Sequence, residues 1–386
     1  MTSTTRAAAL AHPLRPSTWR SAVSVDTSRT SFAAPVRVGL AVGLVLLAGG
    51  LAGQRDIVGF AALGALISAF GRPDPYPVRM GRLAALGVGI TASIAVGGLV
   101  GLSGGALATE IVAVALLSGV AAVVVGALRV AGPGAVVFVF AATASAGFVT
   151  DAMDFWRSLA AAAAGALIGL IAALAPWLWA RVRHRLAGGA RPPSAGDVEY
   201  QSVWASMARV THPDLLATGA RMTAAAAVSA VIAAAAGFDH PMWAAMGAVA
   251  TLQGVGYHLT VTRGIARLLG NLAGALIAAG LLALPLGYWG AVVSIMVFQT
   301  IAEITAPMNY AICSTAVTPM ALLLTALGAG LTPAAAVDRV ADTLIGIVVG
   351  IVVAALTLSA TDHVPGAAHR PGRPVRERLS RAVRRW

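Results

Sequence analysis

Residues 111–128, IVAVALLSGVAAVVVGAL, form a run of eighteen residues without a charge. A helix of roughly 20 apolar residues spans the ~30 Å hydrocarbon core of a bilayer. Twelve comparable apolar stretches lie between Ala33 and Leu358. We therefore predict an all-α, polytopic membrane protein with about twelve transmembrane helices. The predicted spans are approximately 33–53, 56–70, 82–102, 108–128, 134–150, 155–179, 215–236, 241–254, 266–284, 289–306, 309–327 and 338–358.

The composition supports a chain surrounded by lipid. Of its 386 residues, 58% are hydrophobic and only 11% are charged, whereas a water-facing surface needs far more charge. A net charge of +12 on the surface of a globular protein would favour binding to nucleic acid. Here the arginines lie in loops and tails beside the apolar stretches, so we predict no nucleic-acid partner.

The positions of the positive charges predict the topology. All 27 are arginines, and with the N-terminus inside, 24 lie on the cytosolic side. Only Arg55, Arg157 and Arg339 then lie outside, which satisfies the positive-inside rule. We therefore predict a multi-pass protein of the bacterial plasma (inner) membrane with both termini in the cytosol.

One polar segment divides the chain into two halves. The predicted parts are a cytosolic N-terminal tail at 1–32, membrane halves at 33–180 and 214–360, a cytosolic linker at 181–213 and a basic cytosolic tail at 361–386. Arg82 and Arg267 are 185 positions apart, as are Gly89 and Gly274. Because each half has an even number of spans, we predict two parallel six-helix repeats.

Several classes of chemistry find no support in the residue pattern. The single Cys313 excludes an intramolecular disulfide, and no histidine forms a zinc-type pattern with a nearby acid. The chain has no lysine and hence no Walker-type lysine for ATP. No nucleophile–base constellation is found, so we expect no enzyme, no metal and no cofactor. Homo-oligomerisation is left open.

The second half carries a recognisable set of motifs. These are the Trp243 span, Arg263, Arg267-x-x-Gly270, Gly274, Glu303, Pro307-x-Asn309-Tyr310, Thr318-Pro319 and Arg339-x-x-Asp342-Thr343-x-x-Gly346. In this order and spacing they resemble the fusaric acid resistance protein family, over about 238–358. That family includes bacterial aromatic acid exporters and is distantly similar to plant anion channels.

The resemblance implies a membrane transporter that exports small aromatic or other organic acids. Two departures limit it: the linker is shorter than the cytosolic domain of larger exporters, and the first half lacks a counterpart of Glu303 to Tyr310. A passive anion channel and a non-transporting scaffold in cell-envelope assembly are the alternatives. The expected partners are the lipid bilayer and a small organic anion.

Candidate coupling residues lie in the last three spans. An ionised carboxylate in hydrocarbon costs roughly 2.5 kcal/mol or more, so Glu303 is either a proton-coupling group or an interfacial cap of the Pro307 turn. Asn309 and Tyr310 are candidate transport residues because they belong to the motifs that carry the resemblance. Arg339 and Asp342 are spaced i, i+3 and form either part of an outer gate or a helix cap.

Other candidates lie around the short second and eighth spans. Paired short segments at matching places in two halves indicate a transport site, although ordinary tilted helices would look the same. The polar residues at the break where the eighth span ends, predicted to line the pore, are Gln253, Tyr257 and His258. The predicted anion mouth consists of Arg82, Arg263 and Arg267, which as single residues also suit topological anchoring.

Overall fold

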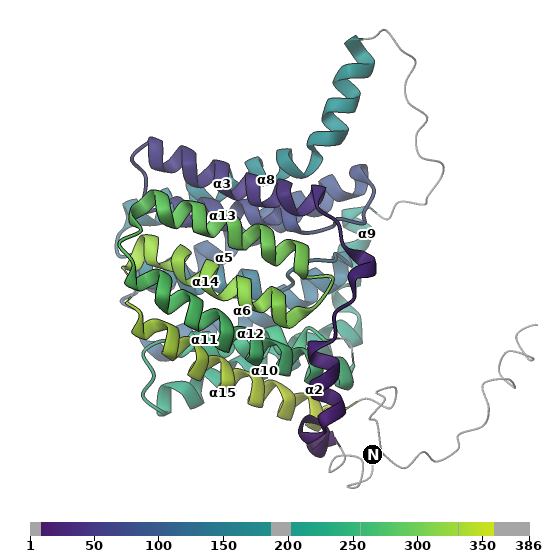
Figure 1. The fold of residues 1–386 in the computed structure, drawn as a ribbon, viewed down its shortest axis with the longest axis vertical. Helices are drawn as coiled ribbons and strands as arrows, with labels where there is room; N and C mark the ends of the chain where they lie inside the picture. Colours follow the sequence, from purple (N-terminus) through teal and green to yellow (C-terminus); the bar gives the residue numbers. More distant parts are fainter. Residues whose placement is uncertain (1–8, 187–201, 255, 331, 359–386) are drawn as a thin grey trace, which may run out of the picture.

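The computed structural model describes residues 9–186, 202–254, 256–330 and 332–358, and within these ranges every regular element is helical. The central part of the predicted linker and the predicted basic tail lie outside the described residues. Figure 1 shows the long helices side by side in one bundle.

Two segments precede the bundle: η1 (His12–Leu14) with α2 (Pro16–Val23), and η2 (Thr27–Arg29). The helices of the first half are α3 (Ala33–Leu51), α4 (Val58–Ala65) with η3 (Leu66–Ala69), α5 (Tyr76–Leu102), α6 (Leu107–Leu128), α7 (Val136–Phe148) and α8 (Ala152–Leu186). After α9 (Val203–Met207) and η4 (Ala208–Thr211) come α10 (Pro213–Ala235), α11 (Met242–Leu252), α12 (Tyr257–Ala283), α13 (Gly287–Thr305), α14 (Tyr310–Ala329) and α15 (Ala334–Leu356).

Among the described residues, nine helices are long and apolar enough to cross a bilayer. The other three apolar segments are Val58–Ala69, Val136–Phe148 and Met242–Leu252. At a rise of 1.5 Å per residue, the eleven residues of α11 extend only about 16 Å, roughly half of the hydrocarbon core. The structure is thus a multi-pass membrane protein, and the count of twelve spans stays a prediction.

Two predicted spans begin too late. The third predicted span, 82–102, corresponds to α5, which begins at Tyr76. The ninth predicted span, 266–284, corresponds to α12, which begins at Tyr257. Each of the two helices has 27 residues. The prediction treated arginines as markers of the loop. Buried arginines of these helices instead find polar partners in neighbouring segments, so the helices continue past them.

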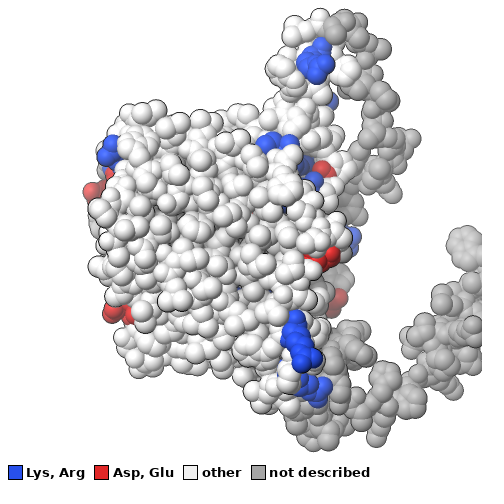
Figure 2. Space-filling view, viewed as in Figure 1, with Lys and Arg blue, Asp and Glu red and all other residues white. Residues whose placement is uncertain are grey.

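The bundle has two distinct ends. We call the end at which α3, α5 and α12 begin the N-terminal end, and the other the opposite end. The N-terminal end is on the right in Figures 1 and 2. The face in Figure 2 carries arginines mainly at this end and hardly any charge along the middle. An almost uncharged flank is what lipid contact requires.

Helix pairs at corresponding places of the two halves pack alike. The short α4 packs on α8, and the short α11 packs on α15. Likewise α5 packs on α7 and α8, while α12 packs on α14 and α15. A Cβ at Gly165 would collide with the backbone of α4, and one at Gly346 with that of α11. Glycine allows this close approach of helix backbones in lipid.

Candidate functional site

A cavity lies between the two halves at the opposite end. Its volume is about 470 Å³, and it is bounded by the first turns of α4 and α11 and the last turns of α7 and α14. The rings of Phe60 and Phe148 meet edge to face in its wall, with centroids 5.3 Å apart. Phe140 and Trp243 also line it. The cavity therefore offers four aromatic side chains to a ligand, and the rest of its wall consists of small, aliphatic and polar residues, Asp56 among them.

Two arginines of α12 share one face of that helix, four residues apart. Arg267 is 5% exposed, and its Nη1 donates to the Tyr310 hydroxyl at 3.2 Å. The guanidinium of Arg263 lies 3.8 Å from the centroid of the same Tyr310 ring. Its Nε donates to the carbonyl of Ala250 at 2.9 Å. We call Arg263, Arg267 and Tyr310 the arginine pair site.

The arginine pair site carries positive charge without a counter-ion. Within the part of the chain that the structure describes, no carboxylate lies within 4 Å of Arg263 or Arg267. Burying an unpaired cation is costly because its hydration is lost. A small carboxylate would relieve this cost, since guanidinium binds carboxylate through parallel hydrogen bonds.

Gln253 joins the end of α11 to the first half. It lies ten residues after Trp243, about 15 Å further along the helix direction than the cavity wall. With its amide oriented so that both ends are satisfied, the nitrogen donates to the Pro133 carbonyl at 3.0 Å. The oxygen then accepts from the backbone of Ala135 and Val136 at 3.1 and 3.0 Å. This contact brings the halves together between the cavity and the N-terminal end.

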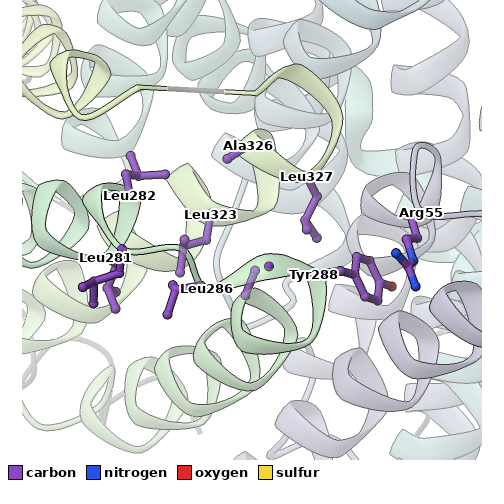
Figure 3. Close-up of a pocket in the computed structure, with 11 residues that line it drawn as sticks. Arg55, Leu281, Leu282, Leu286, Tyr288, Leu323, Ala326 and Leu327 are labelled. Atoms are coloured by element: carbon purple, nitrogen blue, oxygen red, sulfur yellow. The ribbon is translucent and has the colours of Figure 1, made fainter.

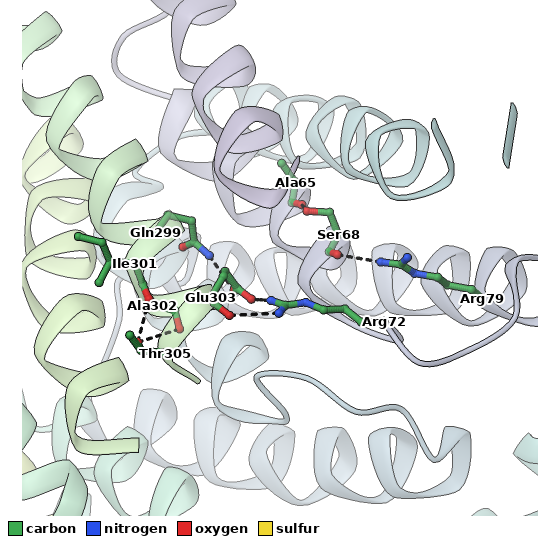
Figure 4. Close-up of polar contacts among 9 residues, drawn as sticks. All are labelled: Ala65, Ser68, Arg72, Arg79, Gln299, Ile301, Ala302, Glu303 and Thr305. Carbon is green, nitrogen blue, oxygen red and sulfur yellow. Dashed lines mark hydrogen bonds and ion pairs between the residues drawn. The ribbon is translucent and has the colours of Figure 1, made fainter. Parts of the chain in front are cut away.

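Glu303 forms an ion pair with Arg72, as Figure 4 shows. Arg72 belongs to the loop after η3 in the first half and Glu303 to α13 in the second, so the pair joins the two halves. The Gln299 amide donates to Glu303 Oε1 at 2.9 Å, and Arg72 Nη1 donates to the Glu303 carbonyl at 3.1 Å. Burial lowers the pKa of Arg72, with the positive charge of Arg79 adding to the effect. The structure therefore places Glu303 in a bridge, not in a cap of the Pro307 turn.

Two further arginines on α5 have partners of their own. Arg82 Nη1 lies 2.9 Å from Asp74 Oδ2, so this predicted mouth residue has a counter-ion. Arg79 is 4% exposed and donates to the carbonyls of Ser68 and Ala173 at 3.2 and 3.4 Å. The first of these bonds caps the last turn of η3. Sequence reasoning counted Arg72 and Arg79 only as topology signals and missed their contacts.

Arg339 and Asp342 lie near the opposite end on α15. Both are buried, and no ion pair within 4 Å joins them in the described residues. Arg339 lies 5.1 Å from the Trp243 ring, and Trp243 stacks on His240 at 4.2 Å. Both oxygens of Asp342 are without a hydrogen-bond donor among the described residues. Arg339 thus lies behind the part of the cavity wall that Trp243 forms, and Asp342 lies about one turn further along α15.

The other predicted residues contact the segment before α3. The Asn309 side chain caps α14 by accepting from the backbone of Ala311 and Ile312 at 2.7 and 3.0 Å. Its amide nitrogen points to residues 22–24. The Tyr257 hydroxyl donates to Ala9, and His258 contacts His12. The structure thus places Tyr257 and His258 against the N-terminal segment, apart from the cavity lining.

A second hollow of about 360 Å³ lies at the opposite end, beside α12, α13 and α14 (Figure 3). Leucines form most of its wall, and Arg55 at its edge lies 4.9 Å from the Tyr288 ring centroid. Apart from Arg55, its lining comes from the second half alone. It therefore does not lie on a path between the halves.

Comparison with known proteins finds a match between part of the chain and a protein family. Residues 226–353 match the family described as "Fusaric acid resistance protein-like". The match runs from within α10 to within α15 and contains the arginine pair site and Glu303. The resemblance noted from the motifs is confirmed for this segment. No curated protein and no solved structure matches the chain.

Proposed function

We propose that this protein is a secondary transporter that exports small organic anions, aromatic acids among them, from the cytosol of a bacterium. The observation that carries the proposal is the arginine pair site. Arg263 and Arg267 lie inside a membrane protein without a carboxylate within 4 Å in the described chain. An anionic substrate supplies the missing charge, and the aromatic side chains of the cavity at the opposite end offer contacts to its ring on the way out.

The path runs between the two halves, which we propose to be parallel repeats. The similar packing of α4 on α8 and of α11 on α15 supports this. The first helix of each half also packs on the fourth of the other, α3 on α13 and α10 on α6. Two halves related in this way can rock against each other around a central site.

In this arrangement the described conformation faces outward. The N-terminal end, which we place in the cytosol because arginines gather there, is closed by the Arg72–Glu303 pair and by Gln253. The cavity at the opposite end is the exit vestibule. Release of the substrate from the arginine pair site would lead through this aromatic vestibule to the outside.

Glu303 is the proposed coupling group. In the outward-facing state, a proton that arrives from the outside through the cavity binds its carboxylate and removes the charge that holds Arg72, so the N-terminal end opens and the arginine pair site meets the cytosol. Loss of the proton to the cytosol, followed by anion binding, restores the ion pair and turns the site outward. One proton then enters for each anion that leaves.

The decisive experiment is transport in proteoliposomes with a panel of labelled aromatic carboxylates. For wild type we expect anion movement against its gradient when a proton gradient is imposed. Movement only down the anion gradient, unaffected by pH and equal in Glu303→Gln, would mean a passive channel. No movement of any compound would favour the envelope scaffold.

A further inference from the structure

An N-terminal strap, defined as residues 9–31, lies across the ends of α12 and α14 (Figure 1, dark purple). The Tyr257 hydroxyl donates to the Ala9 carbonyl at 2.7 Å. Asn309 Nδ2 donates to the carbonyls of Ala22 and Ser24 at 3.1 and 2.7 Å. The strap is thus hydrogen-bonded to α12, the helix that carries both arginines of the site, and to Asn309, the residue before Tyr310.

One further contact between the strap and α12 involves two titratable side chains. His12 Nε2 lies 2.8 Å from Nδ1 of His258 on α12, and His12 is only 2% exposed. Thr18 on α2 approaches the other ring nitrogen of His12 at 3.4 Å. Among the described residues, Tyr257 on α12 also lies near His12, with ring centroids 6.1 Å apart, and Arg15 places a positive charge near it.

A proton on this pair opposes docking of the strap. Burial lowers the pKa of His12, and His258 and Arg15 lower it further. A released strap exposes His12 to water, where its pKa returns to about 6.5. Because the docked pKa is the lower one, the contribution of neutral His12 to docking is fully present above about pH 6.5 and is lost as the pH falls below it.

We propose that the His12–His258 pair is a proton-binding site that senses cytosolic pH and releases the strap when the cytosol becomes acidic. The proposal rests on the proposed function, which places this end in the cytosol. Release would free α12 and α14 to separate at their N-terminal end and admit an anion to Arg263 and Arg267.

The chemistry of the substrate class explains why such a sensor is useful. A weak organic acid crosses a bilayer in its neutral form and ionises inside, leaving both an anion and a proton in the cytosol. Acidification therefore accompanies accumulation of the compounds that the transporter would export. A strap that opens at low pH raises export when the substrate is present.

Strap release can be measured without transport. In a Cys313→Ala background, Ala22→Cys places a thiol on a side chain that is buried while the strap is docked, and Ser17→Cys places one on an exposed strap position. We expect the labelling rate at Ala22→Cys, divided by that at Ser17→Cys, to rise several-fold from pH 7.5 to 5.5. His12→Gln, which cannot take up the proton, should remove this rise, while His184→Gln on the exposed end of α8 should retain it.

Transport supplies the second readout. With pH set on the strap side of the membrane, wild type should move an aromatic carboxylate faster at pH 5.5 than His12→Gln does, and the two should be similar at pH 7.5. Asn309→Ala, which removes two hydrogen bonds to the strap, should raise the labelling rate at Ala22→Cys and give faster transport at pH 7.5.

The outcomes separate the sensor from the proposed function. A labelling ratio that is constant with pH, or that rises equally in His12→Gln, overturns the sensor even if anions are transported. A pH-dependent ratio in a protein that moves no anion would uphold the sensor and overturn the transport function.

Discussion

Arginines of the same membrane bundle differ in what neutralises them. Arg82 has Asp74 at 2.9 Å, and Arg72 has Glu303. Among the described residues, Arg267 has as its polar side-chain partner the neutral hydroxyl of Tyr310 at 3.2 Å. An arginine whose charge is already paired gains little from an added anion, so we propose Arg267, rather than Arg82, as the residue that binds substrate.

The first prediction compares these two arginines. Arg267→Gln should weaken binding of an aromatic carboxylate to the purified protein at least tenfold, since a charge-assisted hydrogen bond contributes about 1.5–3 kcal/mol. Arg82→Gln should change the dissociation constant by less than about twofold, because the charge of Arg82 is already paired. Calorimetric titration measures both. Equal losses in the two variants would contradict the assignment of the arginine pair site.

The second prediction concerns the Arg72–Glu303 pair. Glu303→Gln leaves Arg72 without its counter-ion, and we expect the free energy of unfolding to fall by about 1–3 kcal/mol. The loss should be smaller than in a fully buried pair because the Arg72 side chain is 22% exposed.

A double-mutant cycle checks the origin of that loss. Arg72→Gln with Glu303→Gln should cost less than the sum of the single changes if the two groups interact. Additive effects in detergent-solubilised protein would show that the pair does not contribute as a unit.

Short helices that contact long ones through glycine are the main feature at the scale of elements. Gly346 on α15 packs on the backbone of α11 between Ala244 and Ala248, while Gly280 on α12 has nothing within 4 Å of a Cβ. The same residue type thus has a packing role in one helix and none in the other.

The third prediction uses this contrast. Gly346→Ala should lower the free energy of unfolding by about 1–3 kcal/mol because its Cβ overlaps backbone atoms that cannot rotate away. Gly280→Ala should be neutral or stabilising by up to about 1 kcal/mol, since alanine favours the helix. Thermal unfolding of the two variants measures the difference, and similar stabilities would argue against tight packing of α11 on α15.

At the scale of the whole molecule, contacts between the halves differ at the two ends. Near the N-terminal end, Arg72 meets Glu303 and Gln253 meets the loop before α7. At the opposite end a cavity of about 470 Å³ separates the helices. If the protein works by the proposed alternating access, the first set of contacts has to break in each cycle.

The fourth prediction tests that requirement. In a Cys313→Ala background, Arg72→Cys and Glu303→Cys joined by a short, reducible thiol cross-linker should stop downhill flux of the anion, which does not need the coupling group, and a reductant should restore it. Arg157→Cys with Asp56→Cys, cross-linked in the same way, is the matched control, because these residues form an ion pair at 2.8 Å within the first half. Downhill flux that continues through the cross-linked Arg72/Glu303 variant would show that the halves need not separate at this end.

Much of the fold follows from local sequence. The apolar stretches predicted the helices and their order, because the length and hydropathy of a segment decide whether it can remain in lipid. The starts predicted for α5 and α12 were wrong, because hydropathy cannot distinguish a buried arginine within a helix from an arginine in a loop. The spacing of Gln299 and Glu303, four residues apart on one helix face, was a local signal that was overlooked.

The sequence by itself determined that this is a helical membrane protein, and its motifs indicated that the segment 226–353 resembles the fusaric acid resistance protein family. Only the tertiary structure decided which arginines have partners. Glu303 meets Arg72 and His258 meets His12 although each pair lies more than 200 positions apart. Hydropathy is a property of each segment alone, whereas the neutralisation of a buried charge depends on which distant segment packs beside it.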